Sequence, residues 1–306
     1  MQRTIFILIL IASATPWCGP VMALTAGILF SLVLGNPWKQ QTAAWSKRAL
    51  QWSVFGLGFG VSLVAIWQTG RDAVLYTPAS IALTVAVGLL LGRLLVTPPR
   101  VATLIAFGTA ICGGSAIAAM APVMQADDEE IAVALATVFS LNAAALLLFP
   151  PIGHLLGLTE RQFGLWAALA IHDTSSVVGA AAAYGGAALA VGTTVKLARA
   201  IWIAPSALLA ARLSGRRQVK ARIPLFIIGF IAAAGVRALL PDLSSLWQLL
   251  AAIARQGLVV TLFLVGTGLT REVLQRVGVR PLLLGVILWV LVSAAVLAAV
   301  STGVLS

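Results

Sequence analysis

The sequence predicts an all-α membrane protein, a single transmembrane domain over residues 1–306 with ten or eleven transmembrane helices. Of its 306 residues, 60% are hydrophobic and only 9% are charged, whereas soluble domains carry about 25% charged residues. The mean hydropathy is +1.04. So few charges cannot cover a globular surface in water, and lipid is therefore the expected solvent for most of the outer face.

Apolar segments follow one another along the chain, and all but the first approach the roughly 20 residues that a span needs. Pro, Gly and charged residues separate them, as at Asn36-Pro37. The first follows Arg3 and ends at Ala12-Ser13-Ala14, which fits either a cleaved signal peptide or a short retained helix. The segments cover residues 4–15, 17–34, 48–68, 76–96, 103–124, 130–150, 162–185, 187–212, 223–240, 246–269 and 281–303.

The charged residues predict how these segments are oriented. If the 35–47 loop is cytoplasmic, fourteen basic residues share its side, while Arg71, Arg237 and the acidic run Asp127–Glu130 lie opposite. This positive-inside bias predicts a bacterial inner-membrane protein with a periplasmic C-terminus. It also accounts for the net charge of +11, so that no nucleic-acid partner is expected. The fourteen are Lys39, Lys47, Arg48, Arg93, Arg100, Arg161, Arg212, Arg216, Arg217, Lys220, Arg222, Arg271, Arg276 and Arg280.

A faint internal repeat indicates an inverted duplication. Six residues recur 208 positions later, and the copies are seven predicted spans apart, so they cross the membrane in opposite directions. Inverted repeats are typical of secondary transporters, and here they predict halves 16–150 and 160–306. Chance similarity among glycine-rich helices is the alternative. The pairs are Phe55/Phe263, Gly58/Gly266, Gly60/Gly268, Ser62/Thr270, Ile66/Leu274 and Gly70/Gly278.

One polar segment interrupts the apolar background at Thr109, Gly113, Gly114 and Ser115. Each glycine costs a helix about 1 kcal/mol relative to alanine, so the glycine pair predicts a break near mid-span. Backbone amides at the start of the second half-helix would attract an anion, with Thr109 and Ser115 as hydroxyl donors. Close helix packing through small residues is the alternative.

A second polar segment is His172-Asp173-Thr174-Ser175-Ser176, near the middle of its predicted span. A lone charge at that depth costs about 3 kcal/mol or more. Asp, Thr and Ser are good N-caps, so we predict that Asp173 caps a half-helix inside the membrane and that the serines contact substrate. His172 either couples transport to protons or stays neutral and hydrogen-bonded to backbone.

Basic residues are predicted at the same depth as Asp173. A turn at Gly185-Gly186 places Asp173 thirteen residues before Gly186 and Arg199 thirteen after it, with Lys196 one turn away on the same face. With Arg255, also inside a predicted span, three basic residues accompany one carboxylate. Such an excess of buried positive charge requires an anion or a water-filled cavity, which predicts an anionic substrate.

The remaining polar residues add little. Cys18 and Cys112 lie in apolar surroundings without metal-ligand spacing, so no disulfide, metal or cofactor is expected. Asn142, in the middle of 130–150, is a weaker candidate for the site. No Gly-rich loop ends in Gly-Lys-Ser/Thr, so transport would draw on an ion gradient or the membrane potential.

At these residues the chain resembles the bacterial membrane-protein family named for sulfate export. The matching blocks are 109–116, 170–178 and 193–199, with the stretches 56–60 and 266–269, in the same order along nearly the whole chain. The resemblance implies the cation–proton antiporter and bile-acid symporter superfamily, in which broken helices of two inverted repeats cross at the midplane. It also implies export of sulfate or a related sulfur oxyanion, and related architectures often form homodimers.

The predicted function is therefore a secondary transporter that exports a small anion, namely sulfate, sulfite or a related sulfur oxyanion, and not an enzyme. A cation–proton antiporter stays open, although cation sites usually need more buried carboxylates. An intramembrane hydrolase is disfavoured, because no Gly-x-Ser-x-Gly elbow is present. The predicted substrate-binding residues are Thr109, Gly113, Gly114, Ser115, His172, Asp173, Thr174, Ser175, Ser176, Lys196 and Arg199.

Overall fold

The described residues of this computed structural model, 2–213, 225–272 and 278–305, form helices and no strands, which confirms the all-α class. The repeat residue Leu274 and the basic residues Arg216, Arg217, Lys220, Arg222 and Arg276 lie outside them. In chain order the helices are α1 Gln2–Ser13, α2 Pro20–Leu34, α3 Lys39–Leu57, η1 Gly58–Gly60, α4 Leu63–Leu94, α5 Pro99–Ala110, α6 Gly114–Met124, α7 Asp128–Leu155, α8 Glu160–Ala170, α9 Thr174–Tyr184, α10 Gly186–Ala200, α11 Ile203–Leu213, α12 Leu225–Leu239, η2 Pro241–Leu243, α13 Ser244–Gly266 and α15 Val279–Ser301.

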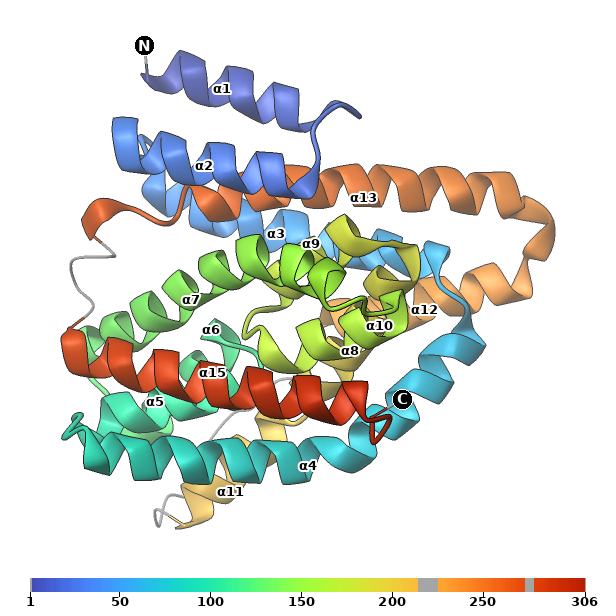
Figure 1. Ribbon diagram of the computed structural model, residues 1–306. Coiled ribbons are helices and arrows are strands. Elements are labelled where there is room, and N and C mark those ends of the chain that lie inside the picture. The colour runs from blue at the N-terminus through green and yellow to red at the C-terminus, as the bar shows by residue number, and fades with distance from the viewer. Residues whose placement is uncertain (1, 214–224, 273–277, 306) are drawn as a thin grey trace.

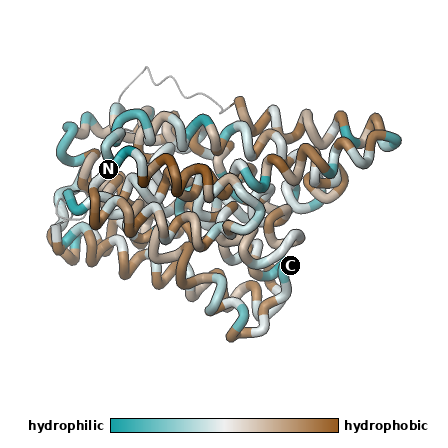
Figure 2. The backbone as a smooth tube through the Cα atoms, turned by 90° about the horizontal axis from the view of Figure 1, so that it is seen from above, coloured by the Kyte–Doolittle hydropathy of each residue, from teal (hydrophilic) through white to brown (hydrophobic). Residues whose placement is uncertain are grey.

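Long apolar helices define the protein as a membrane protein. Among the described residues five stretches are long and apolar enough to cross a bilayer, and a sixth is obtained if a bent pair of helices counts as one span. Helices α4, α13 and α15 run roughly parallel across the view in Figure 1, and the outer helices carry long hydrophobic stretches (Figure 2). The five are Tyr76–Leu94, Asp128–Leu155, Gly186–Leu213, Pro241–Gly266 and Val279–Ser301.

The predicted span 48–68 is not a single helix. Helix α3 ends at Leu57, η1 follows, and the chain bends by 116° before α4 begins at Leu63. Gly58 makes this bend compatible with close packing, because a Cβ there would lie 2.3 Å from the carbonyl oxygen of Phe230 on α12. The hydropathy pattern predicted the connection near residue 72, but it falls near residue 60.

Helices α5 and α6 form a re-entrant hairpin, which we call hairpin 1. Arg100 at the start of the hairpin lies 3.5 Å from Glu130, just beyond its end. The first residue of α5 and the last residue of α6 therefore lie at the same end of the molecule. Gly113 reverses the chain with φ +64°, and a Cβ on Gly108 would meet Ile117 at 3.1 Å. The prediction that segment 103–124 crosses the membrane is wrong, because hydropathy cannot distinguish a crossing from a return.

Helices α8 and α9 form a second re-entrant hairpin, hairpin 2. Glu160 at its start accepts a hydrogen bond from the backbone of Ala187 at 2.7 Å, just beyond its end, and the Tyr184 hydroxyl donates to the carbonyl of Leu158 at 2.6 Å. The predicted crossing of 162–185 is therefore also wrong. Since α7 has 28 residues, or about 42 Å, and separates the two bases, the hairpins enter from opposite ends.

The two corrections cancel beyond Gly186, so the predicted orientation changes only for residues 125–161. The acidic run joins the side of the 35–47 loop, and Arg161 moves to the other side. The predicted bias becomes thirteen basic residues against three, still a strong positive-inside pattern. The acidic run has a structural role as well: Asp127 and Glu130 form a capping box that begins α7.

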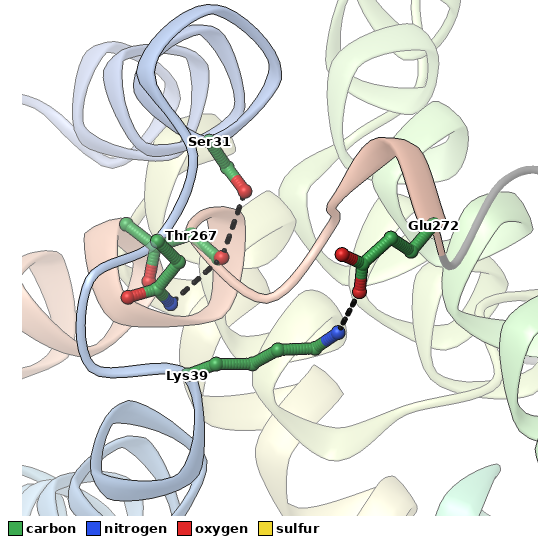
Figure 3. Close-up of polar contacts among 5 residues, drawn as sticks. Ser31, Lys39, Thr267 and Glu272 are labelled. Carbon is green, nitrogen blue, oxygen red and sulfur yellow. Dashed lines mark hydrogen bonds and ion pairs between the residues drawn. The ribbon is translucent and has the colours of Figure 1, made fainter.

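The end that carries the 35–47 loop is closed by contacts between α2, α3 and the end of α13 (Figure 3). The hydroxyl of Ser31 and the amide of Asn36 both donate to the carbonyl of Thr267 at 3.0 Å, and Lys39 lies 2.6 Å from Glu272. These contacts place residues 31–39 and 267–272 at one end of the molecule, as the charge pattern predicted.

Local features agree with an inverted duplication. Helices α3 and α13 each end beside a repeat glycine, and a Cβ on Gly58 or Gly266 would lie 2.3 or 2.5 Å from a neighbouring carbonyl oxygen. Each hairpin is followed by a 28-residue helical stretch, Asp128–Leu155 or Gly186–Leu213. The relation of the whole halves 16–150 and 160–306 stays a prediction.

Candidate functional site: the crossing of two hairpin tips

The tips of the two hairpins meet near the middle of α7. A Cβ on Gly113 in tip 1 would lie 3.5 Å from the backbone nitrogen and Cα of Asp173 in tip 2. The Asn142 side-chain oxygen accepts hydrogen bonds from the backbone amides of His172 and Asp173, both at 3.1 Å. Asn142 is the fifteenth of the 28 residues of α7, so this hairpin crossing (residues 109–116 and 168–176) lies near the bilayer midplane.

Lys196 and Arg199 bind the C-terminal ends of the first helix of each hairpin. Lys196 Nζ donates to the carbonyls of Ile171 at 2.7 Å and Ala168 at 3.3 Å. Arg199 donates from Nε to Ala110 at 2.6 Å and from Nη1 to Leu169 at 2.9 Å, and so joins the two hairpins. Both side chains are fully buried. Each positive charge therefore lies at the negative end of a helix dipole.

This geometry corrects two sequence predictions. The depth match is right, since α10 brings Lys196 and Arg199 to the crossing, but neither forms an ion pair with Asp173 within the described residues. Backbone carbonyls left unpaired by the helix breaks take the donors instead. Arg255 is not part of the crossing: it is exposed on α13, donates to the carbonyl of Ala251 and lines a separate cavity.

Asp173 caps α9, as predicted. Its Oδ2 atom accepts hydrogen bonds from the backbone amide of Ser175, at 2.9 Å, and from the Ser175 hydroxyl. The Asp173 residue is only partly buried, whereas Thr174, Ser175 and Ser176 are buried. The carboxylate therefore satisfies the start of α9 and is still accessible from outside the packed core.

The start of α6 has no comparable cap. Its N-cap is Gly113, which offers no side chain, so the first backbone amides of α6 have no side-chain acceptor at that position. Gly114 is partly exposed and Ser115 is exposed. The positive end of a half-helix is thus accessible at mid-membrane depth, next to the tip of hairpin 2.

Buried polar atoms without a hydrogen-bond partner gather around the crossing. They are Thr109 Oγ1, Asn142 Nδ2, both ring nitrogens of His172 and Arg199 Nη2. Each such atom costs about 1–3 kcal/mol if it is left unpaired. Each of the five can donate a hydrogen bond in some protonation state, tautomer or rotamer. The crossing is therefore rich in donors, which suits an acceptor-rich ligand.

The charges at the crossing sum to a positive value. A helix N-terminus carries about +0.5 and a C-terminus about −0.5 elementary charge, so the four half-helix ends cancel. Lys196 and Arg199 then outweigh the carboxylate of Asp173 by about one charge, when all three are ionised. The sequence argument for excess positive charge survives in reduced form, without Arg255.

All eleven predicted site residues lie in the two tips or bind to them, although their roles differ from those predicted. Lys196 and Arg199 hold backbone carbonyls, and Ser115 is exposed beside the tip. Asn142 has a more direct role at the crossing than its sequence context predicts. The sequence signal for this role is a lone amide side chain in the middle of an apolar segment. Among the described residues no group of three or more His, Cys, Asp and Glu side chains could hold a metal ion.

Fold and site together define a polytopic helical membrane protein whose opposed re-entrant hairpins meet beside the middle of α7. The family model described as "Conserved hypothetical protein 698" matches residues 3–285, and the chain belongs to this family.

Relatives named as UPF0324 membrane proteins agree with this assignment. The one from Geobacter sulfurreducens is 58% identical over 299 residues, 98% of this chain and 96% of the relative. The one from Bdellovibrio bacteriovorus is 47% identical over 294 residues, 94% and 90% of the two chains. A third, from Porphyromonas gingivalis, is 46% identical over 288 residues, 93% and 87% of the two chains. No solved structure matches this chain.

Proposed function

We propose that the chain is a secondary transporter of the bacterial inner membrane that exports a small anion, most simply sulfate, sulfite or a related sulfur oxyanion. The observation that carries this proposal is the start of α6 at the tip of hairpin 1, where the N-cap Gly113 offers no side chain, Gly114 is partly exposed and Ser115 is exposed. Helix N-termini bind anions through free amides and the helix dipole. The sulfur oxyanion rests on the resemblance to the family named for sulfate export.

Lys196 and Arg199 support the anion without being its main ligands. Their bonds to the carbonyls of Ala110, Leu169 and Ile171 occupy the negative ends of the broken helices. The donors left without a partner near the start of α6 are the buried atoms Arg199 Nη2 and Thr109 Oγ1. Lys196 and Arg199 thus neutralise backbone carbonyls that would otherwise repel a bound anion.

A specific observation favours a second candidate, a cation–proton antiporter. Asp173 is the one acidic side chain at the crossing in the described structure, and it is partly exposed. A carboxylate at mid-membrane depth is a common ligand for a transported cation. A hydrolase receives no such support, since neither ring nitrogen of His172 has a hydrogen-bond partner, serine or otherwise, in the described structure.

The Asp173→Asn variant separates the two candidates, because asparagine is as good an N-cap as aspartate but carries no charge. For an anion site we expect labelled sulfate or sulfite flux in proteoliposomes to be kept or to rise. For a cation site we expect sodium- or potassium-dependent proton movement in the wild type and its loss in the variant. Wild-type protein that moves no sulfur oxyanion under either pH gradient would contradict the anion proposal.

A matched variant tests the α6 terminus directly. Ser115→Asp puts a carboxylate in the first turn of α6, where it competes with an anionic substrate for the free amides. We expect at least a tenfold rise in the apparent KM for the anion. Ala118→Asp, one turn further along the same exposed face, is the control for added charge alone and should leave the KM within about twofold.

A further inference from the structure

A polar cavity, which we call the outer cavity, lies away from the crossing, between α12, α13 and the bend that joins α3 to α4. It has a volume of about 250 Å³, and Arg237 and Arg255 both line it. The other lining residues are Phe59, Gly60, Pro241, Ser244, Trp247, Gln248 and Ala251. The lining residues of α13 recur at one helical face, so the cavity follows that helix inward from its first residue, Ser244.

Arg255 marks the depth of this cavity. It lies eleven residues after Ser244 on α13, which corresponds to about 16 Å along the helix axis. Among the described residues no carboxylate forms an ion pair with Arg255 or with Arg237. A charged side chain at this depth must face water or a counter-charge rather than lipid, so two unpaired guanidinium groups point to a hydrated, positive cavity.

A narrower cavity adjoins the larger one on the side that faces α10. Its volume is about 80 Å³, and it shares Gly60, Ala251 and Arg255 with the larger one. On the far side it is lined by Thr193 of α10. Thr193 is 1% exposed, and its hydroxyl has no hydrogen-bond partner in the described structure. Thr193 lies one turn before Lys196, about 5 Å along the helix.

We propose that Arg237, Arg255 and Thr193 form an outer binding site for a small oxyanion, on the side of the molecule opposite the 35–47 loop. The inference rests on the proposed anion transport and adds a second subsite to it. Two guanidinium groups supply charge and planar donors that match oxyanion oxygens, and Thr193 supplies the next donor toward the crossing. The stacked rings of Phe59 and Trp247, 5.1 Å apart, form an apolar part of the cavity wall.

The test measures the potential inside the cavity and needs no transport. In a protein with Cys18 and Cys112 replaced by alanine, Gln248→Cys places a thiol in the cavity wall. Its rates of modification by an anionic sulfonatoethyl and a cationic trimethylammonioethyl methanethiosulfonate are each divided by the rate with a free thiol in solution. We expect this normalised ratio to favour the anionic reagent about tenfold or more, and to fall to near one in Arg237→Gln/Arg255→Gln.

Leu249→Cys is the matched control, because Leu249 adjoins Gln248 in sequence but does not line the cavity and is 57% exposed on the outer surface. We expect it to react slowly with both reagents. Sulfate should slow the anionic reaction at Gln248→Cys at constant ionic strength, whereas gluconate should not. A normalised ratio near one with both arginines present, or no protection by sulfate, overturns the outer site.

The two proposals fail separately. If no oxyanion crosses the membrane in proteoliposomes while sulfate still protects Gln248→Cys, the outer site holds and the transport proposal falls. If flux is measured and the normalised ratio stays near one, the transport proposal holds and the outer site falls.

Discussion

Lys196 and Arg199 show how a fully buried cation can be stabilised without a carboxylate. In hydrocarbon every unpaired carbonyl costs several kcal/mol, and each broken helix exposes carbonyls at its first half. The two side chains donate to four of these carbonyls. Arg199 reaches both hairpins and Lys196 reaches hairpin 2, so the two side chains replace hydrogen bonds that an unbroken helix would have made within itself.

Replacing Lys196 tests this role. Lys196→Met keeps the length of the side chain but leaves the carbonyls of Ile171 and Ala168 without their donor, so we expect a loss of at least about 2 kcal/mol in the free energy of unfolding. Denaturant titration in mixed micelles measures it. Lys39→Met removes only the exposed ion pair with Glu272 and should cost less than about 1 kcal/mol. Equal losses in the two variants would refute the proposed role of Lys196.

At the scale of elements, both hairpins have a break at the tip and a tie at the base, and hairpin 2 also has a side-chain cap. In hairpin 2 these are the extended residue Ile171, the Asp173 cap and the contact of Glu160 with the start of α10. In hairpin 1 the cap is missing and Gly113 takes its place. The two hairpins therefore present different chemistry at the same depth: one tip carries a carboxylate, and the other begins its second helix without a side chain at the N-cap.

Gly113 can be tested apart from packing. Its backbone, at φ +64° and ψ −125°, is strained for any residue with a Cβ by about 1–3 kcal/mol, while the space around it would admit a methyl group, with contacts at 3.4–3.5 Å. We expect Gly113→Ala to lower the midpoint of thermal unfolding and to reduce anion flux. Gly114→Ala, at a helical position, meets the ring of Phe139 at 3.1 Å and the side chain of Leu135 at 3.4 Å and is the control; a greater effect there would contradict the argument.

At the scale of the whole molecule, two opposed hairpins bring their tips together because the 28 residues of α7 separate their bases. Helices of about eleven residues are long enough to reach the midplane from one end of the molecule. This is the length of α5, α6, α8 and α9. The narrower of the two outer cavities is lined by α10, which follows hairpin 2, and by residues of α3, α12 and α13. The site and its access path thus lie between parts that are distant in sequence.

Labelling from the two sides of the membrane tests this topology. In a background without native cysteines, we expect an impermeant thiol reagent to modify Glu129→Cys from the same side as Gln40→Cys, and Arg161→Cys from the opposite side. All three positions are exposed. A topology in which both hairpin segments cross predicts the reverse for Glu129 and Arg161. Modification of Gln40→Cys and Arg161→Cys from one side would therefore exclude the re-entrant arrangement.

By itself the sequence determined the solvent of this protein, its helical class and the residues of the crossing. Hydropathy, the glycine pair at Gly113 and the capping series from Asp173 are local properties, and local backbone chemistry acts in the same way in any surroundings. The equal spacing of Asp173 and Arg199 about Gly186 was sufficient to match their depths.

Only the tertiary structure decided that the two broken segments turn back, that Lys196 and Arg199 bind carbonyls rather than Asp173, and that Arg255 lines a cavity of its own. Hydropathy measures the polarity of a segment but not its direction, so a hairpin and a span look alike. The partner of a buried charge is the acceptor that packing places nearest to it. For Lys196 and Arg199 the nearest acceptors are backbone carbonyls of the broken helices, not a carboxylate.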